Sequence, residues 1–340
     1  MVRVLELFEQ LCDAEDEAVQ RTLAREPREI RIRVLGMLAA DRGGAEIPSE
    51  DEVLWALAED LLDDLSDLPS EWTPPRHLPD IDLLRELGRG GMGVVFEARQ
   101  HRPDREVAVK FLGPAYASAA EEAQALATLR HPAIPIIYQV GQHQGAVYLV
   151  MERVRGRPLL EWAEGRTVDE RLAMFLALCD AVQHAHDAGI LHRDLKPSNV
   201  LVDDQRAWVL DFGLAWSEGH GPNGVIGTLP YIADEVLGGA TASRASDVFS
   251  LGVLLAELLG GPRPTGGSRG SVSMQRRMRL KNPPSSWNHH PIPELNSIVR
   301  CALAPIGERY PTVRALARDI ERFRQHRPPE AHKGGALYGL

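Results

Sequence analysis

Cysteine is scarce in this chain of 340 residues, which contains only Cys12, Cys179 and Cys301. The three lie far apart and form no C-x-x-C pair, which argues against a disulfide framework and against a zinc site. Such sparse cysteine is typical of a protein from a reducing compartment. Because Cys179 falls on an apolar helical stripe, we expect it to be a small buried side chain.

Long apolar runs are missing as well. A membrane-spanning helix needs about 18 or more consecutive apolar residues, and the longest candidate, LGVLLAELLGG at 251–261, is shorter and contains Glu257. Residues 1–17 lack the uninterrupted apolar core and the cleavage site of a signal peptide. These absences predict a cytoplasmic protein with no membrane span and with a buried helix at 251–261.

Charge of one sign is absent from two segments. Residues 43–75 contain no Lys or Arg, and residues 262–293 contain no Asp or Glu. The simplest interpretation of the basic segment is a solvated loop, and the alternative is a docking face. The formal net charge of −10 further argues against a nucleic-acid partner, whose binding site would need a basic face.

Residue patterns divide the chain into parts of different structure. Helical periodicity at 2–40 and 50–66 predicts a small all-helical module over residues 1–75. Prolines around its end suit a linker at 76–80 between this module and the rest of the chain. Short β-type runs follow from residue 81, interrupted by a helical segment at 118–130. From 168 onward the pattern is mostly helical. We therefore expect an α+β chain with a cleft between a β-rich and an α-rich part.

Two motifs in the β-rich part suggest contacts with phosphate groups. Gly88, Gly90 and Gly93 form G-x-G-x-x-G, and the strand-like VVFEA that follows favours a hairpin whose backbone folds over phosphates. An ordinary hairpin turn would explain the glycines alone. Lys110 ends the apolar run VAVK and could either snorkel to water or contact phosphates beside a helix carboxylate. Glu122 is the expected carboxylate, and Glu121 is the alternative.

A polar stretch, LHRDLKPSNVLVDD at 191–204, supplies reactive groups. Asp194 could accept a proton from an attacking hydroxyl, and Lys196 could neutralise a transferring phosphoryl group. Asn199 offers an amide oxygen to a hard divalent metal, and Asp211 in WVLDFGLA offers a carboxylate. Phosphoryl transfer depends mainly on positioning and charge neutralisation, which this set could provide.

These motifs occur in the order of a known family. The chain resembles the eukaryotic-type (Hanks-type) Ser/Thr protein kinases, and its bacterial members in particular, over about residues 81–325. GTLPYIADE at 227–235, SDVFSLGVLLAELL at 246–259 and ERYPTVRALARDI at 308–320 extend the resemblance. It implies a bilobal fold with an N-lobe at 81–155 and a C-lobe at 156–325, followed by a tail at 326–340.

The resemblance also implies a role for each site residue. Asp194 would be the catalytic base, Lys196 the phosphate stabiliser, and Lys110 and Glu122 an ion pair that positions ATP. Mg²⁺, with Mn²⁺ as an alternative, would bind Asn199 and Asp211. The expected ATP-binding residues are Leu87, Gly88, Gly90, Gly93, Val95, Ala108, Lys110, Met151, Glu152, Val154, Leu201 and Asp211. Asp247 would brace the catalytic loop, and Glu235 would pair with Arg309.

One departure from the family pattern concerns the loop that accepts substrate. Where the family usually has Ala-Pro-Glu, this chain has Ala233, Asp234 and Glu235. Because Glu235 is kept, its ion pair can form, and we expect the lost proline mainly to loosen the loop. Thr228 and the DLKPSN signature agree with serine and threonine as acceptors.

The expected activity is transfer of the ATP γ-phosphate to protein Ser/Thr hydroxyls, including autophosphorylation, in bacterial signalling. The alternatives are a pseudokinase scaffold and, with less support, a kinase-like small-molecule phosphotransferase. Expected partners are ATP and a protein substrate. We also hypothesise an intramolecular contact, in which the acidic helix of module 1–75 docks on the basic segment 262–293 or on the N-lobe.

Overall fold

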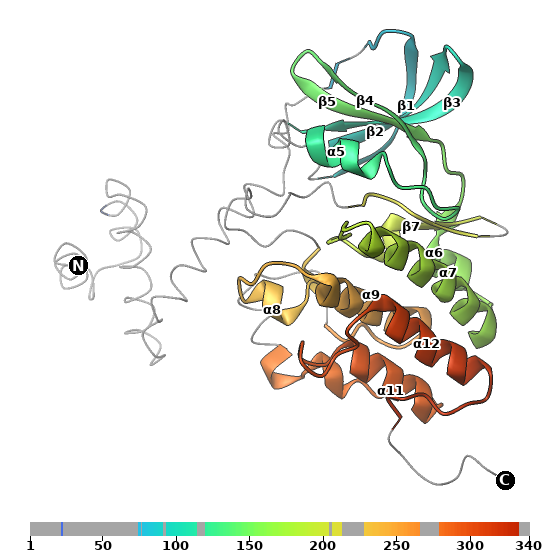
Figure 1. The fold of residues 1–340 in the computed structure, drawn as a ribbon, viewed down its shortest axis with the longest axis vertical. Coiled ribbons are helices and arrows are strands. Elements are labelled where there is room, and N and C mark those ends of the chain that lie inside the picture. Colours follow the sequence, from blue (N-terminus) through green and yellow to red (C-terminus); the bar gives the residue numbers. More distant parts are fainter. Residues whose placement is uncertain are drawn as a thin grey trace. The chain divides into compact units, whose positions relative to one another are not determined.

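The protein is described by a computed structural model. It describes residues 22, 74–75, 77–90, 93–113, 120–203, 206–212, 228–265 and 279–332, with the backbone alone at 120–122. Within these ranges an antiparallel sheet comes first and a helical region follows (Figure 1), as the sequence predicts. Apart from Thr22, the predicted helices at 2–40 and 50–66 lie outside the described residues, and the domain boundaries stay predictions.

The sheet contains five antiparallel strands in the order β1-β2-β3-β5-β4. Their bounds are Ile81–Gly90 (β1), Gly93–His101 (β2), Asp104–Leu112 (β3), Ile137–His143 (β4) and Ala146–Glu152 (β5). Because successive side chains of a strand point to opposite faces of the sheet, β3 contributes side chains to both faces. Val107, Val109 and Phe111 pack in the core of the sheet, while Ala108 and Lys110 lie on the opposite face.

The helical elements come mostly after the sheet. They are α5 (Ala120–Leu126), α6 (Leu159–Ala163), α7 (Val168–Asp187), α8 (Asp234–Leu237), α9 (Arg244–Leu258), α11 (Pro293–Ala302) and α12 (Val313–Arg324), with one-turn 3₁₀ helices η2 (Pro197–Asn199), η3 (Leu229–Tyr231) and η4 (Pro284–Ser286). A second, small sheet joins β6 (Arg157–Pro158), β7 (Val200–Val202) and β8 (Ala207–Val209).

Helix α7 begins and ends where its sequence indicates. Thr167 and Glu170 form a reciprocal capping box at its start. Gly189, just beyond its end, has a φ of 80°, a conformation that glycine adopts without strain. The predicted apolar stripe is buried, including Cys179, whose thiol pKa burial raises. Helix α7 therefore forms part of the main core and ends just before the polar stretch 191–204.

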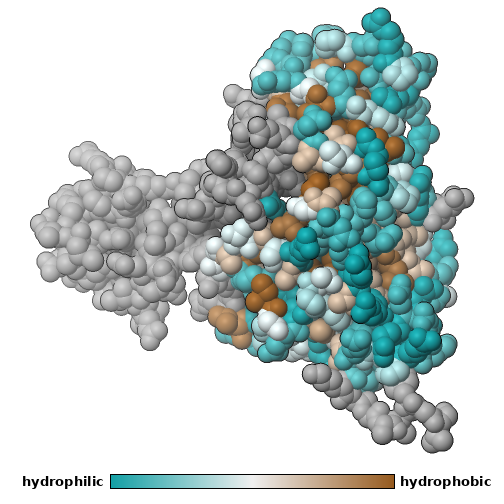
Figure 2. Space-filling model, viewed as in Figure 1, coloured by the Kyte–Doolittle hydropathy of each residue, from teal (hydrophilic) through white to brown (hydrophobic). Residues whose placement is uncertain are grey.

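Helix α9 is buried along most of its length, which agrees with the buried helix predicted at 251–261. No helix among the described residues is long and apolar enough to cross a membrane. The cytoplasmic location stays a prediction. On the face shown in Figure 2, hydrophilic residues cover most of the described surface, with hydrophobic residues in separate patches between them.

The basic segment 262–293 does not behave as one solvated loop. Arg279 is only 4% exposed, and Arg263 forms an ion pair with Glu257 in which its side chain is 26% exposed. Lys281 is exposed, and residues 266–278 lie outside the described residues. The prediction of a solvated loop is therefore wrong for Arg279. Its hydrogen-bond acceptors lie more than 40 residues earlier in the chain, where a local pattern cannot reveal them.

Candidate active site

The loop that carries Asp194 is fixed from helix α9. The carboxylate of Asp247, in the first turn of α9, accepts hydrogen bonds from the backbone N–H groups of His192 and Arg193 at 2.8 and 2.9 Å. Its third partner is Nε2 of His186 on α7, at 2.7 Å. Burial acts to raise the pKa of Asp247, but these hydrogen bonds hold it below its ordinary value. The predicted brace is therefore present, and Arg193 has a φ of 65° within it.

Three residues singled out from the sequence meet around the Asp194 carboxylate. Lys196 Nζ lies 2.8 Å from Asp194 Oδ2 and donates to Thr228 Oγ1 at 2.7 Å. Thr228 donates to Asp194 Oδ1 through both its N–H and its hydroxyl, each at 3.1 Å. Asn199 Nδ2 donates to the carbonyl and to Oδ2 of Asp194 at 2.8 and 3.0 Å. The arrangement presents a carboxylate to a hydroxyl with a cation beside it.

Lys110 pairs with Asp211. Nζ of Lys110 lies 2.8 Å from Oδ1 of Asp211, and the lysine side chain is only 4% exposed. Burial acts to raise the pKa of Asp211, but Lys110 lowers it below the ordinary value, so the carboxyl is ionised. The predicted Lys110–Glu122 pair lies outside the described side chains. The sheet and the segment after β8 are thus joined by an ion pair between a buried lysine and a partly exposed aspartate.

His192 fixes the relative positions of the Asp194 loop and the Asp211 segment. Its Nε2 lies 2.9 Å from the carbonyl oxygen of Leu210, and its Nδ1 accepts the N–H of Asp194 at 3.3 Å. Since a carbonyl only accepts, Nε2 carries the proton. Burial lowers the pKa of His192, which agrees with a neutral ring, and the ring packs 4.7 Å from Phe212.

A cavity of about 370 Å³ lies beside these groups. Its lining combines strands β1, β2, β3 and β5 with the segment from Ser198 to Phe212. Nine of the predicted ATP-binding residues line it: Leu87, Gly88, Val95, Ala108, Met151, Glu152, Val154, Leu201 and Asp211. The lining is largely apolar, with Glu152, Arg153 and Asp211 as its charged residues, so the cavity can enclose a flat apolar ring near charged groups.

Gly90, Gly93 and Lys110 do not line this cavity. Gly93 has a φ of 153° and lies opposite Leu112 on β3, where a Cβ atom would overlap the carbonyl oxygen of Phe111. The pairing of β2 with β3 therefore requires glycine at this position. Gly90 ends β1 and has open space around it.

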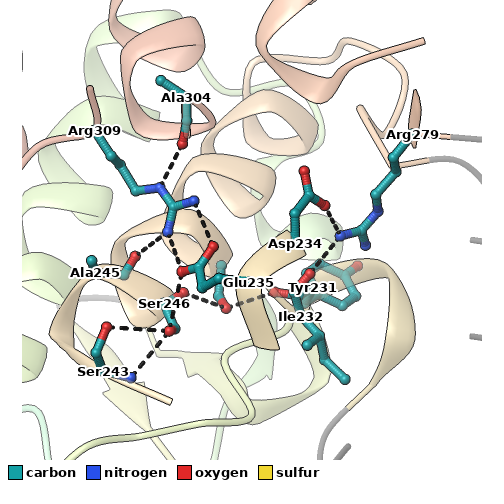
Figure 3. Close-up of polar contacts among 11 residues, drawn as sticks. Tyr231, Ile232, Asp234, Glu235, Ser243, Ala245, Ser246, Arg279, Ala304 and Arg309 are labelled. Carbon is teal, nitrogen blue, oxygen red and sulfur yellow. Dashed lines mark hydrogen bonds and ion pairs between the residues drawn. The ribbon is translucent and has the colours of Figure 1, made fainter. Parts of the chain in front are cut away.

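The predicted Glu235–Arg309 pair is present at the start of α8 (Figure 3). Nη1 and Nη2 of Arg309 donate to the two carboxylate oxygens of Glu235 at 2.8 and 3.0 Å. Arg309 also donates to the backbone carbonyls of Ala245 and Ala304, and Ser246 donates to Glu235. The pair joins the start of α8 to the chain that leads into α12.

Two functional neighbours escaped the sequence interpretation. His186 is a buried histidine on α7 that donates to Asp247, a contact that no motif indicates. Arg279 was expected on a solvated loop, yet it donates to Asp234 and to the backbone near Thr228. No periodicity or motif distinguishes either residue, because each finds its partner more than 40 positions away along the chain.

Comparison with known proteins agrees with this geometry. The family model of the protein kinase domain matches residues 81–318. The chain therefore belongs to the protein kinase domain family.

Among its relatives is serine/threonine-protein kinase PknB of Mycobacterium tuberculosis, 38% identical over 285 residues, which cover 77% of this chain and 46% of PknB. Serine/threonine-protein kinase PrkC of Bacillus subtilis is 33% identical, over 70% of this chain and 40% of PrkC. A probable serine/threonine-protein kinase of Streptomyces coelicolor is 36% identical, over 69% and 38%. The chain spans less than half the length of these relatives.

Proposed function

We propose that the chain transfers the γ-phosphate of ATP to serine or threonine hydroxyls of proteins. The observation that carries the proposal is the carboxylate of Asp194, which already accepts a hydrogen bond from the hydroxyl of Thr228 and has Lys196 at 2.8 Å. The family membership and its serine/threonine kinase relatives support the same reaction.

In this proposal Asp194 accepts the proton of the attacking hydroxyl. Its Oδ1 already accepts a hydrogen bond from the Thr228 hydroxyl, so it can accept one from a substrate hydroxyl. The amide of Asn199 donates to its other oxygen, Oδ2, and fixes the carboxylate. Lys196 stands where it can balance the charge of the transferring phosphoryl group, since its Nζ lies between Asp194 and Thr228. Thr228 begins the segment beside which the acceptor hydroxyl must lie.

The nucleotide would occupy the cavity described above. Val95, Ala108 and Leu201 offer apolar contacts for the adenine ring, while Glu152 and Val154 at the end of β5 offer backbone groups. Lys110 reaches the phosphates from β3, with Glu122 as its proposed second carboxylate. Gly90 and Gly93 would lie over the phosphates as the ends of the β1–β2 hairpin. The sheet and the helical region would then act as two lobes, within a domain of residues 81–325.

The donor set next to the cavity fits a hard divalent cation. Asp211 supplies a carboxylate that is held ionised, and the amide nitrogen of Asn199 is occupied by Asp194, which leaves its carbonyl oxygen as a ligand. No group of three or more His, Cys, Asp or Glu side chains suited to a metal occurs among the described residues, so substrate phosphates would complete the shell. Bound Mg²⁺ would neutralise phosphate charge; Mn²⁺ suits the same oxygens.

The test is phosphorylation with radiolabelled ATP and Mg²⁺, with myelin basic protein as the acceptor. We expect the wild-type chain to label the acceptor and itself, and Asp194→Asn to lose about 10²–10⁴-fold in rate. Nucleotide binding should survive in that variant. Equal background labelling by both proteins would contradict the proposal and favour a scaffold that binds nucleotide without transfer.

A further inference from the structure

Helix α8 begins at Asp234, the position at which the family usually has proline. Proline suits the first position of a helix because its φ is already helical and it lacks an N–H group that would have no partner. The sequence therefore predicts a looser loop. In the structure, however, the carboxylate of Asp234 accepts a hydrogen bond from Nη1 of Arg279 at 2.7 Å, which ties this helix start to a distant part of the chain (Figure 3).

Arg279 also binds the backbone of the preceding segment. Its Nη1 donates to the carbonyl of Ile232 at 2.6 Å, and its Nη2 donates to the carbonyls of Leu229 and Pro230 at 2.9 and 3.3 Å. The remaining carbonyl, that of Tyr231, accepts from the hydroxyl of Ser250 at 2.7 Å. Side-chain donors thus occupy the carbonyls of four consecutive residues, 229–232. The planar guanidinium suits several acceptors at once, as an ammonium does not.

The burial of the two partners is unequal. The side chain of Arg279 is 3% exposed, whereas that of Asp234 is 52% exposed. The guanidinium carbon of Arg279 also lies 5.4 Å from the ring of Phe249 on α9. A buried guanidinium needs several hydrogen bonds to offset its lost hydration. Segment 229–232 supplies most of these bonds, so the cation and the segment fix each other.

Segment 229–232 directly follows Thr228, which contacts the proposed catalytic base Asp194. Leu229 follows Thr228, whose N–H and hydroxyl both bond to the carboxylate of Asp194. An acceptor hydroxyl that reaches Asp194 must therefore come beside Thr228 and the residues after it. A displacement of segment 229–232 would shift that acceptor site, while the nucleotide cavity has no lining residue from the segment.

We propose that Asp234 and Arg279 are positioning residues that hold segment 228–232 for the protein substrate. The inference rests on the proposed kinase function. It adds that these two residues help to determine how tightly the protein acceptor binds. The pair takes over the stiffening that the family usually obtains from proline. The pair affects the binding of the protein acceptor and does not affect the binding of the nucleotide, because segment 228–232 does not line the cavity.

The experiment measures steady-state kinetics with myelin basic protein and ATP. We expect Arg279→Met to raise KM for the acceptor about tenfold or more, because small misplacements of bound groups have large effects. KM for ATP and ATP hydrolysis without acceptor should stay within about twofold, since no cavity residue moves. Asp234→Asn should raise the acceptor KM less, because it removes one partner of Arg279 and keeps the carbonyl contacts.

The matched control is Arg324→Met, which breaks an exposed ion pair with Asp169 and should change neither KM. An unchanged acceptor KM in folded Arg279→Met would overturn the inference, as would equal losses on the ATP side. If Arg279→Met does not fold, Asp234→Asn decides, since its half-exposed side chain keeps an amide oxygen that can accept from Arg279, whose carbonyl partners also remain; a wild-type acceptor KM there overturns the inference. A wild-type chain that hydrolyses ATP but labels no protein contradicts the proposed function itself.

Discussion

His186 shows how much a single residue outside any motif can contribute. It is fully buried on α7 and donates Nε2–H to the Asp247 carboxylate, which in turn holds the backbone of the Asp194 loop. We predict that His186→Leu lowers the free energy of unfolding by about 1.5–3 kcal/mol, the range for a hydrogen bond to a charged group. Urea denaturation measures this change. The control is His184→Leu, a half-buried position on the same helix, which we expect to leave stability nearly unchanged.

At the residue scale, short motifs predicted more than burial or periodicity could. The local spacing of Asp194, Lys196 and Asn199 sufficed to bring them together, because residues within six consecutive positions cannot lie far apart. The Asp211–Lys110 contact depends on how two distant segments fold, and no motif indicated it, while the Lys110–Glu122 pair stays a prediction. Arg279 shows the limit, since only folded coordinates reveal which carbonyls surround a buried cation.

Among the elements, the start of α8 depends on Arg309 for its place in the fold. Arg309→Met would leave the carboxylate of Glu235 partly buried without its cation and would free the carbonyls of Ala245 and Ala304. We predict a loss of about 3 kcal/mol in the free energy of unfolding at neutral pH. Arg314→Met is the control, because its pair with Asp187 is exposed to solvent and contributes little to stability.

The same ion pair predicts a pH dependence. Burial acts to raise the pKa of Glu235, but Arg309 holds it below the ordinary value. The pair's stabilisation is therefore complete above the unfolded pKa of about 4.3 and is lost as the pH falls through the lower native pKa. The difference in unfolding free energy between wild type and Arg309→Met should shrink in acid. A constant difference between pH 7 and pH 3 would contradict this coupling.

How well each element could be predicted depended on its length. The alternation in β3 and the capping signals of α7 exceed the noise of local sequence, so their existence was evident. Strands β6, β7 and β8 have two or three residues each, too few for any period to show. Their pairing nevertheless carries Leu201 to the cavity and leads into Asp211, so part of the site rests on elements that no pattern indicated.

For the whole molecule, the open question is the segment that precedes the kinase domain. Residues 43–75 carry acids without bases, and the basic segment 262–293 includes exposed Lys281. If the hypothesised contact forms, deletion of residues 1–75 should change kcat/KM for a protein acceptor by about fivefold or more, the range of typical coupling between sites. Acceptor kinetics and thermal unfolding of both chains test this. Identical kinetics and identical stability would exclude the contact.

Gly93 has a consequence for reading relatives of this chain. A residue without a side chain is required here because the backbone carbonyl of Phe111, on the neighbouring strand, occupies the place of a Cβ atom. This requirement does not depend on nucleotide binding. A descendant that had lost catalysis would still be under selection to keep this glycine, because the sheet would distort without it. Retention of Gly93 is thus a record of a folding constraint, and inheritance of activity has to be judged from Asp194 and Asp211.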